Sequence, residues 1–337
     1  MHPEMSLVFL TVLAGAGQGL FILFIVLDFF MPGVFSHLLM LLTCGVALIL
    51  QFSGMAASFF HLGNAQKGWK AILKWDQSWL SREVIFLSMF VGLLMLYVLS
   101  FYVGLTVEIS RLIGFAGLVA AVGFFISSSM VYASVRFIKE WANAYTPINF
   151  SLLSLLTGGA ILYALSNLTQ EKNSVLTQLN HFLFYFTFFA LVFKVLAFRY
   201  NETTYASVKT KNALGMNDTD IRLMDTGAAY DHYNTLEYKH HIAPAMKKFQ
   251  ERLVLLLTFI LPLIVWFTFE QQLSIPFTGG ALSLLAAISI LIGVIIERRL
   301  FFIEGNHVQN LYYGNFVFKN IKNPILSKAK KGTPVPL

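Results

Sequence analysis

Eight long apolar stretches constrain the fold of this chain more than any other feature of its sequence. They cover about 6–27, 35–60, 84–107, 112–135, 148–169, 176–193, 253–269 and 272–296, and none contains a Lys, Arg, Asp or Glu. Crossing about 30 Å of hydrocarbon takes roughly 20 apolar residues in a helix. A buried helix of a soluble protein rarely stays apolar for so long, and here the pattern recurs eight times. Each stretch therefore predicts a transmembrane helix.

The charge content also indicates a membrane protein. Only 12% of the residues are charged, about half of the roughly 25% that is typical of soluble domains. The single cysteine, Cys44, lies within an apolar stretch and excludes a disulfide framework and a protein-ligated iron–sulfur cluster, which needs about four thiolates. We predict an all-α, polytopic membrane protein with an eight-helix bundle over 1–318, including a loop over 194–252, and a basic tail over 319–337.

Charge is distributed unevenly between the two sides of the predicted bundle. With eight spans, both termini and three loops share one side, and that side holds 22 of the 24 Lys and Arg residues. The other side has only Arg111 and Lys172. Because Lys and Arg near span ends are enriched on the cytoplasmic side, we expect both termini to be cytoplasmic. The excess of Lys and Arg on this side has two interpretations. It reflects the topological bias alone, or it also forms a docking platform for an acidic soluble partner or for anionic lipid headgroups.

Two ionisable residues at the basic ends of neighbouring spans form a candidate site. His61 ends the second stretch in SFFHLGNAQKGWK, and Glu83 opens the third in SWLSREVIF. The two spans are antiparallel neighbours, so both residues are expected at a similar depth. A histidine can donate one hydrogen bond and accept another, and a nearby carboxylate can orient it or pass a proton. Ionisable groups at the interior edge of a bundle tend to be functional, although an interfacial His and Glu can also simply snorkel.

Basic and aromatic residues gather at the same ends of several even-numbered spans. They are Lys67, Trp69 and Lys70 after the second span, Arg136, Lys139, Trp141 and Tyr145 after the fourth, and Arg298 and Arg299 after the eighth. Such residues belt every membrane interface. Only their convergence on one side favours a polar wall that a ring-shaped ligand entering from the lipid would meet.

The histidines and motifs give little support to a cofactor bound by this chain. A bis-histidine haem is conceivable at the opposite end, where His37 and His181 begin even-numbered spans, because haem needs axial ligands at one depth. Neither histidine has an evident basic partner for the haem propionates. We find no metal-site spacing, P-loop, GxGxxG, HExxH or GxSxG motif, and we predict no bound metal or cofactor and no nucleic-acid partner.

These motifs resemble the anchor subunit of the dimethyl sulfoxide reductase family. The stretch SFFHLGNAQKGWKAILKWDQSWLSREVIF has that family's His-Leu-Gly element, followed by Ser-x-Glu at the start of the next helix. RFIKEWANAYTPINF is similar to its basic-aromatic stretch ending in Thr-Pro, and IIERRLFFIEGNHVQNLYYG is similar to its last-helix Arg-x-x-Phe ending. The likeness covers the whole chain, and its most specific part is the spacing from His-Leu-Gly to Glu.

The resemblance implies a three-subunit complex in the bacterial inner membrane. A molybdopterin subunit transforms the substrate, a four-cluster ferredoxin-like subunit transfers electrons, and the anchor exchanges them with quinone. Carried over by motif, His61, Gly63, Lys67 and Glu83 match positions tied to quinol binding, with His61 and Glu83 in the acid–base role. Lys67 stands where the family often has an arginine, which keeps the charge but loses the bidentate fork.

Further basic and aromatic residues at the same ends of the spans complete the expected quinone site and the expected docking surface. Trp69, Arg136 and Tyr145 are expected to join the quinone-binding residues. The cations expected to dock the iron–sulfur partner are Lys70, Lys74, Arg82, Lys139, Arg298 and Arg299.

Two departures narrow the resemblance to one branch of the family. The 194–252 loop is longer than in enterobacterial anchors, and Val294 replaces a Glu one turn before the final Arg. These two departures, together with the stretches YASVRFIKEWA and RLMDTG…NTLEY, resemble the anchors of cytoplasmic sulfite dehydrogenases. In those enzymes electrons pass from sulfite to quinone.

Three alternatives stay open: the anchor of a sulfoxide reductase that oxidises menaquinol, a b-haem quinol oxidoreductase, and a secondary transporter or channel. A transporter is disfavoured because no span has a mid-membrane charge or a clear Pro/Gly break with polar residues on both halves.

Overall fold

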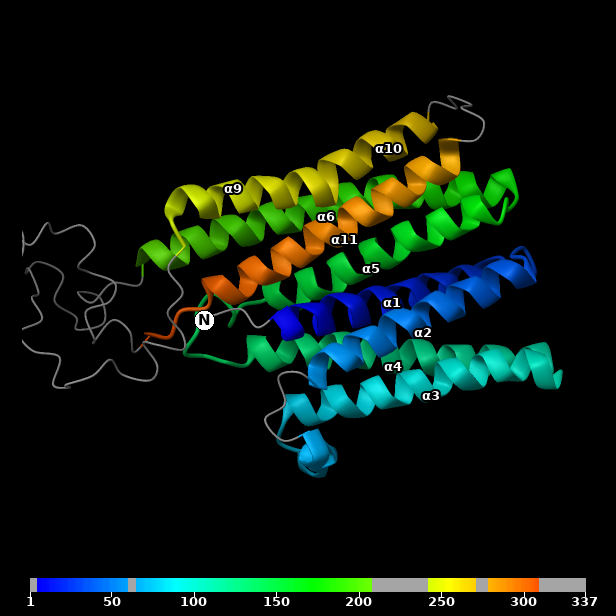
Figure 1. Ribbon diagram of the computed structural model, residues 1–337, viewed down its shortest axis with the longest axis horizontal. Coiled ribbons are helices and arrows are strands. Elements are labelled where there is room, and N and C mark those ends of the chain that lie inside the picture. The colour runs from blue at the N-terminus through cyan, green and yellow to red at the C-terminus, as the bar shows by residue number, and fades with distance from the viewer. Residues whose placement is uncertain (1–4, 60–64, 208–241, 271–277, 309–337) are drawn as a thin grey trace, which may run out of the picture.

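The computed structural model describes residues 5–59, 65–207, 242–270 and 278–308, which contain helices and no β-strand. Eight helical rods in it are long and apolar enough to cross a membrane, and they run side by side (Figure 1). This confirms the predicted all-α fold. The rods are α1 (Met5–Phe30), α2 (His37–Phe59), α3 (Trp79–Val103), α4 (Val107–Ala133), α5 (Tyr145–Leu168), α6 (Asn173–Ser207), the continuous series α9 (Pro244–Leu255), η2 (Leu256–Ile260) and α10 (Leu261–Glu270), and α11 (Thr278–Glu304).

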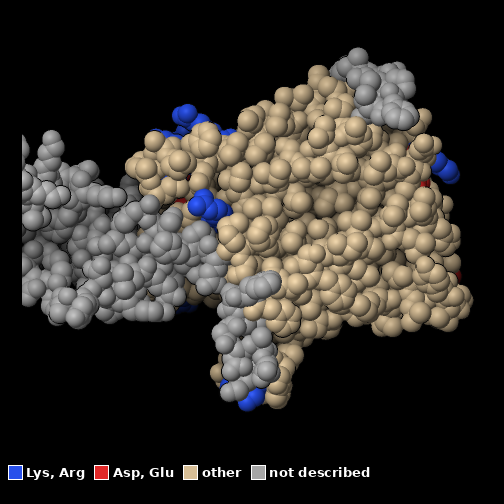
Figure 2. Space-filling view, viewed as in Figure 1, with Lys and Arg blue, Asp and Glu red and all other residues tan. Residues whose placement is uncertain are grey.

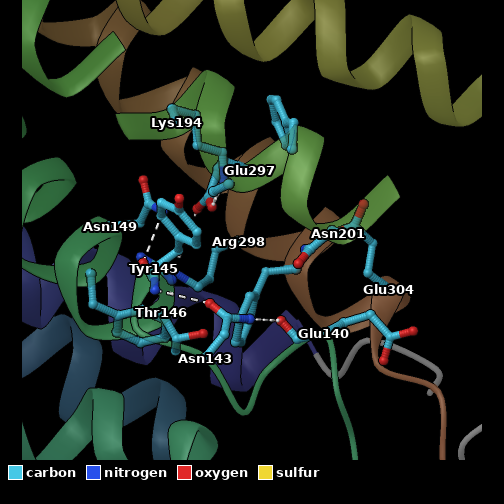
Figure 3. Close-up of a pocket in the computed structure, with 14 residues that line it drawn as sticks. Glu140, Asn143, Tyr145, Thr146, Asn149, Lys194, Asn201, Glu297, Arg298 and Glu304 are labelled. Atoms are coloured by element: carbon cyan, nitrogen blue, oxygen red, sulfur yellow. Dashed lines mark hydrogen bonds and ion pairs between the residues drawn. The ribbon is translucent and has the colours of Figure 1, made fainter. Parts of the chain in front are cut away.

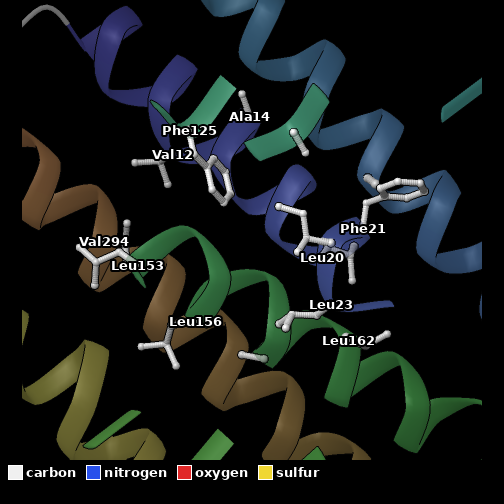
Figure 4. Close-up of a cluster of buried hydrophobic side chains, with 14 of the residues drawn as sticks. Val12, Ala14, Leu20, Phe21, Leu23, Phe125, Leu153, Leu156, Leu162 and Val294 are labelled. Carbon is white, nitrogen blue, oxygen red and sulfur yellow. The ribbon is translucent and has the colours of Figure 1, made fainter. Parts of the chain in front are cut away.

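Helix α1 lies at the centre of the bundle and packs against α2, α4, α5 and α11. Its glycines allow the close approach of α5, because a Cβ on Gly19 would lie 2.1 Å from the Ser154 carbonyl oxygen. A Cβ on Gly158 of α5 would lie 2.1 Å from the backbone nitrogen of Leu20. Small residues let two helix backbones pack in contact within a membrane. Large apolar side chains of α1, α5 and α11 fill the space around this crossing (Figure 4).

Several helices extend beyond the apolar stretches that predicted them. Helix α6 continues to Ser207 and α9 begins at Pro244, so both ends of the predicted 194–252 loop are helical. Pro244 occupies the first turn of α9, where its missing N–H is not needed. Helix α11 continues to Glu304, which places Glu297 and Arg298 inside a helix. The sequence windows ended at the first charge, but a helix can continue where its charged side chains find partners or reach water.

The seventh rod contains a π-helical segment, η2, just before Pro262. Proline lacks an N–H, and its ring clashes with the carbonyl four residues earlier, which belongs to Thr258. A local π-helical turn is one of the adjustments by which transmembrane helices accommodate a proline. The Ser289 hydroxyl of α11 donates to the Leu257 carbonyl oxygen at 2.7 Å, and Gly293 lets α11 approach Thr258 closely.

The two ends of the bundle differ in charge. The start of α1 and the end of α11 lie at the same end of the bundle (Figure 1), which we call the basic end. Most of the Lys and Arg side chains visible in Figure 2 lie there or on the protruding helix η1 (Ala65–Lys74), which precedes α3. At the opposite end, the Ser36 backbone N–H and hydroxyl donate to the Glu171 carboxylate, which joins the α1–α2 turn to the α5–α6 turn.

Candidate functional site

Glu83 is a carboxylate buried near the basic end of the bundle. Helix α3 begins where the Ser78 hydroxyl accepts a hydrogen bond from the Ser81 N–H at 3.4 Å, and this start places Glu83 in the first turns of α3, 7% exposed. Two hydroxyl-bearing side chains of α4 face it. Ser128 lies beside the Glu83 carboxyl, and the phenol of Tyr132 interacts with it electrostatically.

Tyr132 connects Glu83 to a second buried charge, Arg298. Its ring lies 5.3 Å from that of Phe302 and 5.7 Å from that of Phe150, and its phenol interacts electrostatically with both Glu83 and Arg298. The Arg298 side chain is 2% exposed, and its guanidinium carbon lies 3.5 Å from the centre of the Phe150 ring. A cation over an aromatic face is stabilised by the ring quadrupole. Glu83, the half-buried Tyr132 and Arg298 thus form a row of mostly buried polar side chains from α3 through α4 to α11.

A buried ion pair continues this row to α6. Lys194 Nζ pairs with Glu297 Oε1, and the two side chains are 7% and 1% exposed. The Nε atom of Arg298 lies 3.8 Å from the other Glu297 oxygen. Two turns further along both helices, Asn201 Nδ2 donates to Glu304 Oε2 at 2.9 Å. These contacts tie α6 to α11, and a buried charge of this kind is tolerated only when it is paired.

A polar pocket lies between α5, α6, α11 and the 134–144 connection (Figure 3). The space between its lining side chains, counted together with the open solvent at its mouth, is about 370 Å³. Half-buried Asn143, Tyr145 and Asn201 line its outer part, while Lys194 and Arg298 are buried. The rest of its lining consists of Glu140, Thr146, Asn149, Phe150, Ala197, Phe198, Glu297, Phe301 and Glu304.

Several buried polar atoms of this pocket have no hydrogen-bond partner within the described residues. The donors among them are Nε and Nη1 of Arg298, and the acceptors include Glu297 Oε2, Asn149 Oδ1 and Glu140 Oε2. Buried polar groups are nearly always hydrogen-bonded, by protein or by ordered water. The pocket therefore requires a ligand or water that can accept from Arg298 and donate to the oxygens.

Glu140 is an acidic group of this pocket that lies outside the membrane-spanning helices. Burial raises the pKa of its carboxyl to about 7, with the charge of Glu304 adding to the shift, while the Asn306 backbone N–H and Lys247 act in the opposite direction. Lys247 of α9 also pairs with Glu304 at 2.8 Å. The next residue, Trp141, fixes this connection because its indole N–H donates to the Phe301 carbonyl oxygen at 2.9 Å.

The structure describes only part of the predicted quinone site. His61 and Gly63 lie outside the described residues, and so does the side chain of Lys67, so the predicted proximity of His61 to Glu83 stays a prediction. Trp69 on η1 is 61% exposed. Glu83 is buried, as expected of a group at the interior edge of the bundle.

The other predicted residues separate into pocket and surface groups. Tyr145 lines the pocket, with its ring 5.5 Å from that of Tyr200. Arg136 is exposed and is not among the residues that line the pocket.

The predicted docking cations differ in exposure. Lys70, Lys74 and Lys139 are exposed, and Arg299 is half-buried. Arg82 is half-buried, donates to the Trp75 and Asp76 carbonyl oxygens and stacks over Trp79. Arg298 differs from the expectation: α11 carries it into the bundle interior, so its guanidinium is not part of the exposed basic surface.

Sequence reasoning missed the polar partners Lys194, Glu297 and Glu304. It placed Lys194 in a loop and the two glutamates after the last span, because charge was used to mark span ends. A signal was present: Lys194 and Asn201, like Glu297 and Glu304, are seven residues apart, which puts each pair on one face of a helix. Tyr132 and Glu140 lie within the family-like stretches YASVRFIKEWA and RFIKEWANAYTPINF, but the sequence assigned no role to either.

An eight-helix membrane bundle with a row of mostly buried polar side chains near one end defines a polytopic membrane protein, and comparison with known proteins gives its family. The chain belongs to the DMSO reductase anchor subunit (DmsC) family, which matches residues 1–314. It is 31% identical over 329 residues to a sulfite dehydrogenase subunit of Allochromatium vinosum, covering 93% of this chain and 99% of that relative. The chain is therefore an anchor subunit of a molybdoenzyme complex.

Proposed function

We propose that this chain is the quinone-reactive anchor of a molybdopterin oxidoreductase and passes electrons between an iron–sulfur subunit and the quinone pool. The observation that carries the proposal is the buried Glu83 carboxyl at the basic end of an anchor-family bundle, one short connection after His61. The relative from a sulfite dehydrogenase supports sulfite as the substrate of the partner catalytic subunit. In that case electrons flow from sulfite into quinone.

The residues of the proposed site match the needs of quinone reduction. A quinone carbonyl requires a hydrogen-bond donor, and each reduced oxygen requires a proton. His61 donates to the carbonyl, and Glu83 orients His61 or returns protons from the basic end. Lys67 adds positive charge beside the ring or steers the docked iron–sulfur subunit. Gly63, Trp69, Arg136 and Tyr145 belong to the same proposed site.

The proposed setting follows from the charge distribution and the cysteine content. The exposed Lys70, Lys74 and Lys139 side chains, together with Arg82 and Arg299, offer a basic surface to the iron–sulfur subunit. With one cysteine, this chain binds no iron–sulfur cluster, and the clusters and molybdopterin reside in its partners. We place the complex in the bacterial inner membrane with both termini of this chain in the cytoplasm.

The test compares two activities of the same membranes. His61→Ala should leave the complex assembled and sulfite oxidation by an artificial dye nearly normal, because the molybdenum chemistry occurs in another subunit. Quinone-linked oxidation should fall by about 10²–10⁴-fold, the usual contribution of a general acid–base group. Glu83→Gln should act in the same direction, more weakly if Glu83 only orients His61.

His37→Ala is the matched control, because His37 is an exposed histidine at the opposite end of α2. It should leave both activities unchanged. Normal quinone-linked rates in the His61 variant would place the site elsewhere, and the Arg136–Tyr145 region would become the next candidate.

A further inference from the structure

The unpartnered atoms of the polar pocket restrict what can occupy it. Nε and Nη1 of Arg298 donate no hydrogen bond within the described residues, and one oxygen each of Glu297, Asn149 and Glu140 accepts none. Arg298 Nε and that Glu297 oxygen form an ion pair at 3.8 Å, too long for a hydrogen bond. An anion would be repelled by the carboxylates of Glu297 and Glu304, and a cation by Lys194 and Arg298. Water both donates and accepts, and a buried water typically makes two to four such bonds. The donor and acceptor set therefore fits water better than either kind of ion.

The pocket reaches from the basic end of the bundle to the row that contains Glu83. Asn143, Tyr145 and Asn201 are half-buried at its outer part, and Glu140 and Glu304 are only 7% and 8% exposed. Phe150 and Phe301 line the pocket, and the Tyr132 ring packs behind them, 5.7 and 5.6 Å from their ring centres. The charges of Glu83 and Arg298 both act on the Tyr132 phenol. A phenol can donate one hydrogen bond while it accepts another. Tyr132 is therefore suited to connect pocket water with the Glu83 carboxyl.

Glu140 has the properties of a group that exchanges protons near neutral pH. Its carboxyl faces Glu304 of α11, Lys247 of α9 and the Asn306 backbone N–H. Burial raises the pKa of this carboxyl to about 7, and proton transfer is most efficient when the pKa of the group lies near the working pH. Lys247, which pairs with Glu304, is the cation that favours the ionised form of Glu140 after it has lost its proton.

We propose that the pocket between α5, α6 and α11 holds water and that Glu140 passes protons through it, by way of Tyr132, to Glu83 at the quinone site. The inference rests on the proposed quinone function and assigns that site its proton supply. Reduction of one quinone consumes two electrons from the iron–sulfur partner and two protons, and two O–H bonds form on the carbonyl oxygens.

Each proton transfer leaves the residues as they began. The O–H bond of Glu83 breaks as a quinone O–H bond forms, directly or through His61. Tyr132 then gives its proton to Glu83 and receives one from pocket water. Glu140 gives its own proton to that water and takes up another from the basic end. In the reverse direction, quinol oxidation releases the two protons along the same route.

The test uses the assembled complex in membranes with three substitutions: Glu140→Gln, Glu140→Asp and Tyr132→Phe. Glu140→Gln should lower the quinone-linked kcat by about tenfold or more, with little change in the quinone KM and with normal dye-linked activity. Protonated Glu140 is the donor, so the wild-type rate of quinone reduction should fall as the pH rises through about 7. That inflection should vanish in Glu140→Gln, and Glu140→Asp should restore part of the rate.

Glu202→Gln is the control, because Glu202 is a carboxylate of α6 that is 59% exposed and lies outside the pocket. It should change neither the rate nor the pH profile. Copurification of the partner subunits shows whether each variant assembles. If His61→Ala abolishes quinone-linked turnover while Glu140→Gln and Tyr132→Phe keep the wild-type rate and pH profile, the proton route is wrong and the quinone site stands. A His61→Ala variant with normal turnover would instead remove the proposed function.

Discussion

At the scale of single residues, the Lys194–Glu297 pair shows how a bundle of this kind tolerates charge inside a membrane. Both side chains are almost completely buried, and taking two ions out of water costs several kcal/mol each. Their attraction, with Arg298 at 3.8 Å from the second Glu297 oxygen, offsets this cost. Each partner is therefore expected to make the other tolerable in the interior. The pair as a whole is expected to add little to the free energy of unfolding.

Breaking this pair should destabilise the protein, and removing both charges should not. Lys194→Met leaves Glu297 with only the more distant Arg298, and the free energy of unfolding should fall by about 3–5 kcal/mol, the usual cost of one uncompensated buried charge. The double variant Lys194→Met/Glu297→Gln should recover most of the loss. Thermal unfolding in detergent gives the comparison.

Arg199 provides the matched control on the same helix, since its pair with Glu202 is exposed and 3.6 Å long. Exposed pairs contribute about 0–1 kcal/mol, so Arg199→Met should barely shift the unfolding temperature. Equal effects of Lys194→Met and Arg199→Met would contradict the buried pairing.

At the scale of helices, the α1–α5 crossing sets the packing of the bundle. In lipid there is little hydrophobic gain from pressing two helices together, so close van der Waals packing between backbones drives association. Gly15, Gly19 and Gly158 supply that packing, and at Gly19 and Gly158 the nearest atoms are backbone atoms that cannot move aside.

Gly19→Ala should therefore impair folding. The added Cβ would lie 2.1 Å from the Ser154 carbonyl oxygen, and overpacking of this kind typically costs about 1–3 kcal/mol. We expect a lower unfolding temperature and a lower yield of assembled complex. Gly45→Ala on α2 is the control, because its Cβ would meet nothing within 4 Å and alanine is the better helix former. A Gly19 variant as stable as the Gly45 variant would show that the crossing is looser than described.

At the scale of the whole molecule, both ends of the described chain lie at the basic end of the bundle (Figure 1). The polar row, the pocket and the exposed lysines of η1 are on this side, so the partner subunits and the source of protons are expected there. Because Lys and Arg are enriched on the cytoplasmic side of membrane proteins, we expect this end to lie in the cytoplasm.

Reporter fusions test this orientation. Alkaline phosphatase fused after Leu337 should be inactive, because it would stay in the cytoplasm, whereas a fusion in the α5–α6 turn at Lys172 should be active. A fluorescent protein at the C-terminus should fluoresce. The opposite pattern would place the catalytic face in the periplasm, and the substrate proposal would move from sulfite to a sulfoxide or related oxide.

Much of the fold was accessible from the sequence because the lipid acts on each segment separately. A span must be about 20 apolar residues long whatever its neighbours are, so α1 to α6, α10 and α11 were each predicted from local composition. The uneven distribution of Lys and Arg gave the relative sidedness for the same reason. The motif from His61 to Glu83 likewise identified the family without any knowledge of packing.

Only the tertiary structure brought the polar row and the pocket together. Lys194 and Glu297 are 103 residues apart in the chain, and each alone resembles the charged end of a span. Whether such a residue ends a helix or continues inside the bundle depends on a partner supplied by another helix, because an unpaired charge is too costly in the interior. The same holds for Arg298, Tyr132 and Glu140. The local sequence predicts whether each lies in a helix or a loop, but the contacts between helices determine how deeply each is buried and which residues it contacts.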